Sequence, residues 1–143
     1  MSKHVYKTEN TDTKNVKEVR KEGLDKFYTI PSYAKNCINK VFEIREKVIF
    51  DLIIEPSAGN GSFFNQLDFE NKIGIDISPE NENITKMDFF DYEPPNREIN
   101  ILVIGNPPFG KISSIAIKFF NHSAEWANMV AFIIPRTFRR PSV

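Results

Sequence analysis

The stretch D-L-I-I-E-P-S-A-G-N-G-S-F-F, residues 51–64, decides the fold that this sequence predicts. It starts as an apolar run and ends that run on a carboxylate, Glu55. A turn of small residues follows, made of Pro56, Ser57, Ala58, Gly59, Asn60 and Gly61. Residues 62–64 have the character of a helix start. A buried strand that leads through a glycine-rich turn into a helix N-terminus is a small-molecule binding arrangement.

The glycine spacing excludes two common nucleotide-binding motifs. A dinucleotide motif, G-x-G-x-x-G, needs a third glycine where Phe64 stands, and a P-loop needs a following G-K-S/T. A ligand without a pyrophosphate remains, which Gly59 and Gly61 would let the backbone approach closely. Glu55 would then pair with a cationic or hydroxyl-bearing part of that ligand. On these residues alone, a plain tight turn is an equally good interpretation.

The rest of the chain alternates between strand and helix patterns. Apolar runs typical of strands occupy residues 73–77, 84–90, 99–104 and 129–134, and residues 26–29 look extended. Helical spacing of apolar residues covers 31–45 and 112–123, and residues 16–22 could form two helical turns that end at Gly23. This alternation predicts an α/β fold, with a mostly parallel sheet covered by helices on both faces.

Acidic residues end the second and third strands of this predicted sheet. Asp76, followed by Ile77, stands where doubly wound folds place the acid that accepts hydrogen bonds from ribose hydroxyls. Asp88 and Phe89 end the next run, where a carboxylate can accept from an exocyclic amine while the ring stacks on a base. A solvated aspartate beside a core phenylalanine is the alternative.

The fourth strand ends on the most informative motif, Asn106-Pro107-Pro108-Phe109. Proline fixes φ and removes the N–H donor, so the turn is rigid and its carbonyl groups are acceptors with little competition. The Asn106 side-chain oxygen and a neighbouring carbonyl can together accept both protons of a planar amino group. Phe109 can stack on the ring that carries this group. A rigid turn with a buried phenylalanine would explain the prolines and leave Asn106 unexplained.

Composition narrows the class of protein further. The 143 residues carry no net charge, one cysteine (Cys37) and two histidines, which excludes an internal disulfide and makes a cysteine or histidine metal site unexpected. No apolar stretch approaches the roughly 20 residues that span a bilayer, and the polar N-terminus has no signal-peptide core. We expect an intracellular, soluble, single-domain protein without a membrane partner, in which residues 1–14 are disordered.

With these motifs, the sequence resembles the class I S-adenosylmethionine-dependent methyltransferases, in particular the amino-methyltransferases that modify adenine N6. Asn106-Pro107-Pro108-Phe109 is similar to their D/N/S-P-P-Y/F/W signature, and residues 55–63 resemble their cofactor motif. Phe27-Tyr28-Thr29 resembles their upstream aromatic-Thr motif, although Ile30 separates Thr29 from Pro31. The resemblance covers residues 24–143 and implies that residues 15–143 form a Rossmann-like domain that binds S-adenosylmethionine.

The resemblance implies roles for particular residues. Asn106, Pro107, Pro108 and Phe109 would hold the target amine for direct methyl transfer, with Phe109 against the base. The cofactor would contact Phe27, Tyr28, Thr29, Glu55, Pro56, Ser57, Ala58, Gly59, Gly61, Asp76, Ile77, Asp88, Phe89 and Asn106. Arg136, Arg139 and Arg140 would contact nucleic-acid phosphates. For these three arginines, a solvated basic tail is the interpretation that the sequence favours.

The family's sheet normally continues past the fifth strand, whereas this sequence ends soon after Ile134. We therefore expect a sheet truncated after the fifth strand, with a partner chain or a second copy covering the edge strand at residues 129–134. The expected activity is methylation of adenine N6 in DNA or RNA. The alternatives are methylation of a guanine amine or a protein glutamine, or a catalytically silent binding module.

Overall fold

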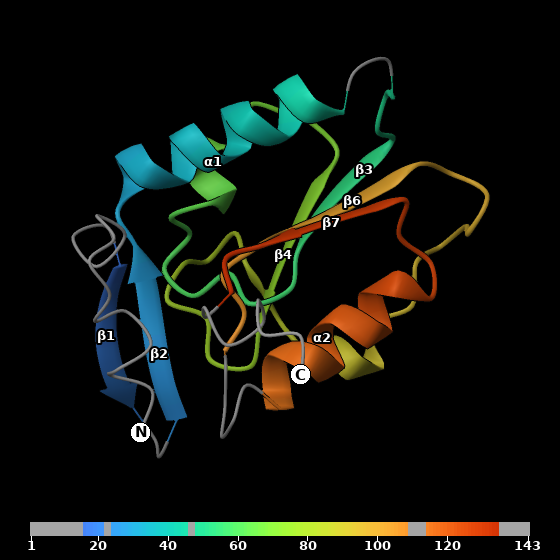
Figure 1. The fold of residues 1–143 in the computed structure, drawn as a ribbon. Coiled ribbons are helices and arrows are strands. Elements are labelled where there is room, and N and C mark those ends of the chain that lie inside the picture. Colours follow the sequence, from blue (N-terminus) through green and yellow to red (C-terminus); the bar gives the residue numbers. More distant parts are fainter. Residues whose placement is uncertain (1–15, 22–23, 46–47, 109–113, 135–143) are drawn as a thin grey trace, which may run out of the picture.

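A parallel sheet forms the centre of the molecule. The computed structural model describes residues 30–45, 48–108 and 114–134, together with the backbone of residues 16–21 and 24–29. The sheet has five strands in the order β5-β4-β3-β6-β7, and all of its pairings are parallel (Figure 1). These strands are β3 (Leu52–Glu55), β4 (Lys72–Asp76), β5 (Thr85–Lys86), β6 (Ile101–Gly105) and β7 (Met129–Phe132). The strand order reverses between β3 and β6, which is the point where open α/β sheets bind ligands.

One α-helix covers each face of the sheet. Helix α1 (Pro31–Ile44), which begins with proline in its first turn, lies across one face, and α2 (Ser114–Ala124) lies across the other (Figure 1). Neighbouring residues of a strand point to opposite faces, so Ile53 packs with the α1 core and Ile54 with the α2 core. The predicted α/β fold, with a parallel sheet and helices on both faces, is confirmed at this level.

The N-terminal segment forms a hairpin, so the helix predicted over residues 16–22 is wrong. Strands β1 (Val16–Lys21) and β2 (Leu24–Thr29) pair antiparallel, with Lys21 opposite Leu24. Residues 22 and 23, which separate the two strands in the sequence, lie outside the described residues. The extended conformation predicted for residues 26–29 is confirmed. The predicted disorder of residues 1–14 lies outside the described residues.

The helix predicted to start at residues 62–64 is reduced to a short 3₁₀ turn, η3 (Phe64–Gln66). Lys72 provides the physical reason, because its Nζ donates to the carbonyls of Phe64 and Leu67 at 2.7 and 3.0 Å and lies 4.4 Å from the Phe64 ring centroid. Carbonyls that a longer helix would have satisfied internally are satisfied here by a side chain from β4. The third predicted strand is also shorter than expected, since β5 spans only Thr85–Lys86 and a second 3₁₀ turn, η4 (Phe89–Asp91), follows.

Strand β7 lies at one edge of the sheet. It pairs with β6 and with no other strand in the described part of the chain, and its residues are half-buried. The edge position predicted for the fifth strand is therefore confirmed. A partner that covers this edge stays a prediction.

Phe89 anchors the core on the α2 face, and its replacement tests that packing. Its ring is 1% exposed and contacts the rings of Phe119, His122 and Trp126, with centroids 5.2, 4.9 and 6.0 Å away. We expect Phe89→Ala to lower the free energy of unfolding by about 3–5 kcal/mol, because the substitution removes a buried ring and leaves a cavity among its neighbours. Phe120→Ala, at a residue that is 47% exposed, is the matched control and should stay within about 1 kcal/mol. Chemical denaturation measures both, and equal losses would contradict this account of the core.

Candidate functional site

The glycine turn after β3 is fastened to the end of β4. Gly59 and Gly61 have φ of 55° and 91°, a conformation that other residues rarely adopt. The Ala58 N–H donates to the Ile75 carbonyl at 2.9 Å, and the Gly59 N–H donates to Asp76 Oδ2 at 2.8 Å. The turn predicted from the sequence therefore exists, and its conformation depends on both glycines.

Asp76 is the acceptor that organises this edge of the sheet. Its side chain is buried, and its second oxygen, Oδ1, accepts the Ser78 N–H at 2.8 Å. The Met87 N–H donates to the Asp76 carbonyl at 3.0 Å, which joins the end of β5 to the same place. The ends of β3, β4 and β5 thus meet at one aspartate, whose carboxylate binds the turn after β3 and whose main-chain carbonyl binds Met87.

Glu55 is the second carboxyl group at this edge, and it is more deeply enclosed. Only 2% of its surface is exposed, and its Oε1 atom has no hydrogen-bond partner among the described residues. Burial raises the pKa of Glu55 well above its usual value. A hydrogen bond from the Phe64 backbone opposes this rise in pKa, the charge of Asp76 adds to it, and the charge of Lys72 opposes it.

Gly105 brings the end of β6 directly against Glu55. A Cβ atom at Gly105 would lie 3.0 Å from Glu55 Cγ and 3.3 Å from Oε2, so a side chain here would displace the carboxyl group. Asn106 and Pro107 follow immediately, and both are buried. The structure therefore brings Glu55, Gly59, Asp76 and the start of the N-P-P motif together at the point where the strand order reverses.

The residues after β5 divide between the core and the surface. Phe89 belongs to the core, so the prediction that its ring stacks on a base is wrong and the alternative, a core phenylalanine, is confirmed. Asp88 is exposed and accepts the Phe90 N–H at 3.0 Å as the N-cap of η4. The sequence analysis missed Phe90, which is 40% exposed. The two adjacent phenylalanines were the available signal, because only one of two neighbouring rings can easily pack into the core.

Exposed apolar side chains flank the acidic edge. Ile77 follows Asp76 directly, Met87 is hydrogen-bonded to Asp76 through its backbone, and Phe90 stands just beyond. Each of these three side chains is at least one-third exposed. The edge therefore offers carboxylates and, beside them, apolar surface.

The remaining predicted residues are placed only in part. Pro56 and Ala58 are buried and Ser57 is half-buried in the turn. The backbone of Phe27, Tyr28 and Thr29 forms β2, which ends beside the first turn of α1, on the side of the sheet where β3 and β6 end (Figure 1). Pro108 is half-buried. Phe109, Arg136, Arg139 and Arg140 lie outside the described residues.

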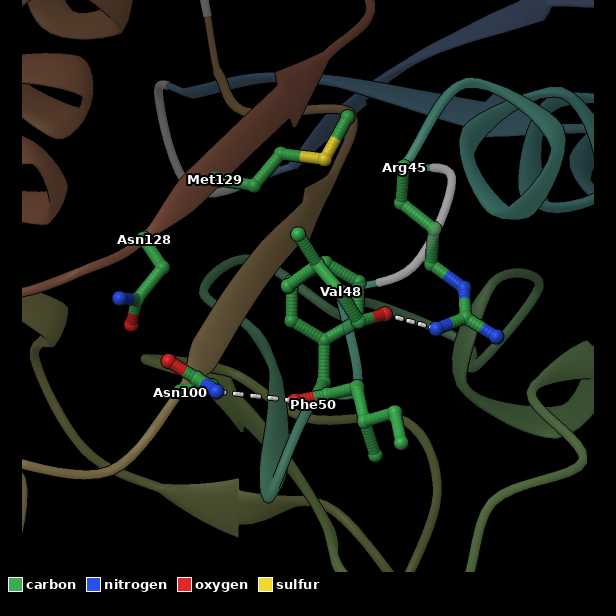
Figure 2. A pocket seen from close by; sticks show the side chains of 7 residues that line it. Arg45, Val48, Phe50, Asn100, Asn128 and Met129 are labelled. Atoms are coloured by element: carbon green, nitrogen blue, oxygen red, sulfur yellow. Dashed lines mark hydrogen bonds between the residues drawn. The ribbon is translucent and has the colours of Figure 1, made fainter.

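A pocket of about 610 Å³ lies at the opposite end of the sheet, where the strands begin (Figure 2). None of the predicted site residues lines it. Its polar groups mostly cap strand starts: Asn128 Oδ1 accepts the Ile101 N–H at 2.7 Å, and Asn100 Nδ2 donates to the Ile49 carbonyl at 3.1 Å. Arg45 donates to the Val48 carbonyl. The acidic edge, rather than this pocket, holds the chemistry that the sequence predicts.

Comparison of the chain with protein-family models, curated proteins and solved structures found no match. Within the described residues, no group of three or more histidine, cysteine, aspartate or glutamate side chains could hold a metal ion. No helix in that part of the chain is long and apolar enough to cross a membrane. The described residues form an α/β protein with a five-stranded parallel sheet and two buried carboxyl groups where its strand order reverses.

Replacing Asp76 tests whether its carboxylate holds the edge together. Asp76→Asn leaves an amide N–H₂ facing a backbone N–H, so at least one charge-assisted hydrogen bond is lost, and we expect a loss of about 1.5–3 kcal/mol in unfolding free energy. Asp88→Asn is the matched control, because Asn caps a helix as well as Asp does and the site is exposed. Equal destabilisation by both substitutions in urea melts would contradict this role of Asp76.

The raised pKa of Glu55 makes stability depend on pH in a defined direction. Glutamate in the unfolded chain has a pKa of about 4.3. Because the folded-state pKa is higher, the folded state binds more protons than the unfolded state above this pH. The unfolding free energy should therefore fall as pH rises, by up to about 1.4 kcal/mol per pH unit, until the folded-state pKa is passed. Glu55→Gln removes this contribution, so the difference between wild type and E55Q should shrink or invert between about pH 5 and 8. A difference that is constant over this range would contradict the raised pKa.

Proposed function

We propose that this chain is a Rossmann-like methyltransferase domain that binds S-adenosylmethionine and methylates adenine N6 in DNA or RNA. One observation carries the proposal. The buried carboxyl groups of Glu55 and Asp76, the glycine turn between them and the Asn106-Pro107 segment converge where the strand order reverses. An open α/β sheet binds its ligand at this point, and each of these groups has a use in the proposed reaction.

The turn and the two acids suit an adenosyl ligand with a cationic end. Carboxylate oxygens accept more than one hydrogen bond, so Asp76 can take ribose hydroxyls in addition to the backbone N–H groups that fix its position. Glu55 Oε1, which has no partner among the described residues, suits a cationic N–H donor. The exposed side chains of Ile77, Met87 and Phe90 offer apolar surface for a purine ring.

Asn106 and Pro107 supply the acceptors for the target amine. In the proposed reaction the Asn106 side-chain oxygen and the Pro107 carbonyl each accept one N–H of the amino group, which aims its nitrogen lone pair at the methyl donor. When bound, S-adenosylmethionine supplies an electrophilic methyl group on a sulfonium sulfur. The C–S electron pair stays on sulfur, and the amine proton leaves to water. Positioning is the main contribution of the protein to such a transfer.

The structure constrains the methyl donor more than it constrains the molecule that receives the methyl group. A duplex base would have to leave the stack to reach an edge formed by buried side chains. A guanine amine or a protein glutamine presents similar N–H groups, and a silent module would bind without transfer. Incubation with methyl-labelled S-adenosylmethionine and separate DNA, RNA and protein pools shows directly which of these molecules is methylated. Label in DNA or RNA adenine is the expected result.

Asn106→Ala separates cofactor binding from transfer. We expect the variant to bind S-adenosylmethionine within a few-fold of wild type and to lose transfer by at least about 100-fold, since the amine loses an acceptor that orients it. Calorimetry measures binding and label incorporation measures transfer. Asn100→Ala, at the opposite end of the sheet, is the control and should leave both unchanged. Wild-type transfer by N106A would contradict the assignment, and no cofactor binding by the wild type at millimolar concentration would contradict the proposed function.

A further inference from the structure

We propose that Glu55 carries a proton in the free protein and releases it when the cationic part of the ligand binds, so that binding is coupled to the release of one proton. The inference rests on the proposed function for the identity of the ligand. It goes further in naming a protonation event at the site, which makes affinity depend on pH. The O–H bond of the Glu55 carboxyl breaks, the proton goes to solvent, and no oxidation or reduction takes place.

The first argument is the surroundings of the carboxyl group. Three elements enclose Glu55 besides its own strand: β4 on one side, the end of β6 at Gly105, and the chain at Phe64. They leave 2% of the residue exposed and give Oε1 no hydrogen-bond partner among the described residues. An ionised carboxylate there would be a buried charge with half of its acceptor capacity unused, which strongly favours the neutral form.

The second argument is the set of charges around it. Asp76, on the neighbouring strand β4, is a like charge and disfavours ionisation of Glu55. Lys72 is the base on β4, but its Nζ is held by the carbonyls of Phe64 and Leu67 and forms no ion pair with Glu55. Neither Gly105 of β6 nor Phe64 of η3 adds a charge. Lys72 therefore favours ionisation of Glu55 only through its charge, without an ion pair, and burial outweighs this effect.

The third argument is what a cationic ligand would add. An ammonium group directed at Oε1 supplies both missing features, a hydrogen-bond donor and a positive charge. Either would favour the ionised carboxyl, and together they reverse the balance set by burial. A ligand that presents only a neutral hydroxyl to Glu55 would leave the proton in place. The protonation change therefore reports which part of the ligand lies beside Glu55.

Titration calorimetry in buffers of different ionisation enthalpy tests the proposal. Wild-type protein is titrated with S-adenosylmethionine between about pH 5 and 8, at each pH in two buffers of different ionisation enthalpy that both buffer there: succinate and MES at the acidic end, phosphate and Tris at the other. The expected result is a buffer-dependent enthalpy that corresponds to release of close to one proton at the acidic end, falling as the free carboxyl ionises. Over the same range the affinity should rise with pH, by up to tenfold per unit.

Two controls make the outcome decisive. Glu55→Gln keeps the shape of the protonated side chain without the titration, so it should fold, bind more weakly and release no proton from this site. The neutral analogue 5′-methylthioadenosine, which has neither ammonium nor sulfonium, should bind without proton release. Equal proton release by wild type and E55Q would overturn the proposal and leave the proposed function standing. No binding of either adenosyl compound would overturn both.

A measurement on the free protein tests, independently of any ligand, whether Glu55 carries a proton before binding. With ¹³C-labelled glutamate, the Glu55 carboxyl resonance, identified by its absence in E55Q, should titrate well above the value of about 4.3 for glutamate in a model peptide. Titration near that value would overturn the proposal even if the ligand binds.

Discussion

The hydrogen bond from the Gly59 N–H to Asp76 Oδ2 is the constraint on which the rest of the site depends. It ties the turn after β3 to the end of β4, and the neighbouring bond from Ala58 to the Ile75 carbonyl fixes the turn's direction. Both glycines can then hold positive φ without a Cβ penalty. The two backbone N–H groups that Asp76 accepts, from Gly59 and Ser78, offset part of the cost of burying its carboxylate. Asp76 can therefore be buried as a structural acceptor and still face the ligand edge.

Glu55, on the neighbouring strand, differs from Asp76 in its hydrogen bonding. Its carboxyl group is enclosed more deeply, yet one oxygen has no partner among the described residues, and Gly105 packs against its side chain. Two acids with contrasting hydrogen bonding at one edge can serve different purposes, because the environment sets the charge state of each. The fold provides this contrast through chain geometry, since the Gly59 N–H of the turn donates to Asp76 while no described residue donates to Glu55 Oε1.

The sequence predicted those parts of the molecule in which local pattern and tertiary structure agree. Apolar runs that end on Glu55 and Asp76 identified β3 and β4, and Pro31 marked the start of α1. Predictions failed where a distant contact decided the outcome. Lys72, from the next strand, ends the turn that looked like a helix start, and strand pairing with residues 24–29 overrides the weak helical pattern of residues 16–22. The burial of Phe89 rather than Phe90 depends on α2 and could not be read from two adjacent identical residues.

The edge strand β7 is connected to the site through Gly105. The Ile133 N–H donates to the Gly105 carbonyl at 3.0 Å, and Gly105 pairs with Phe132, so one side of this glycine is fixed by β7. The Glu55 side chain also lies against Gly105, so close that a Cβ atom here would force it to shift. The direction in which the chain leaves toward Asn106 is therefore set jointly by an edge strand and a buried carboxyl group. Loosening of β7 would be felt at Asn106, because the carbonyl of the preceding residue, Gly105, is held by the Ile133 N–H.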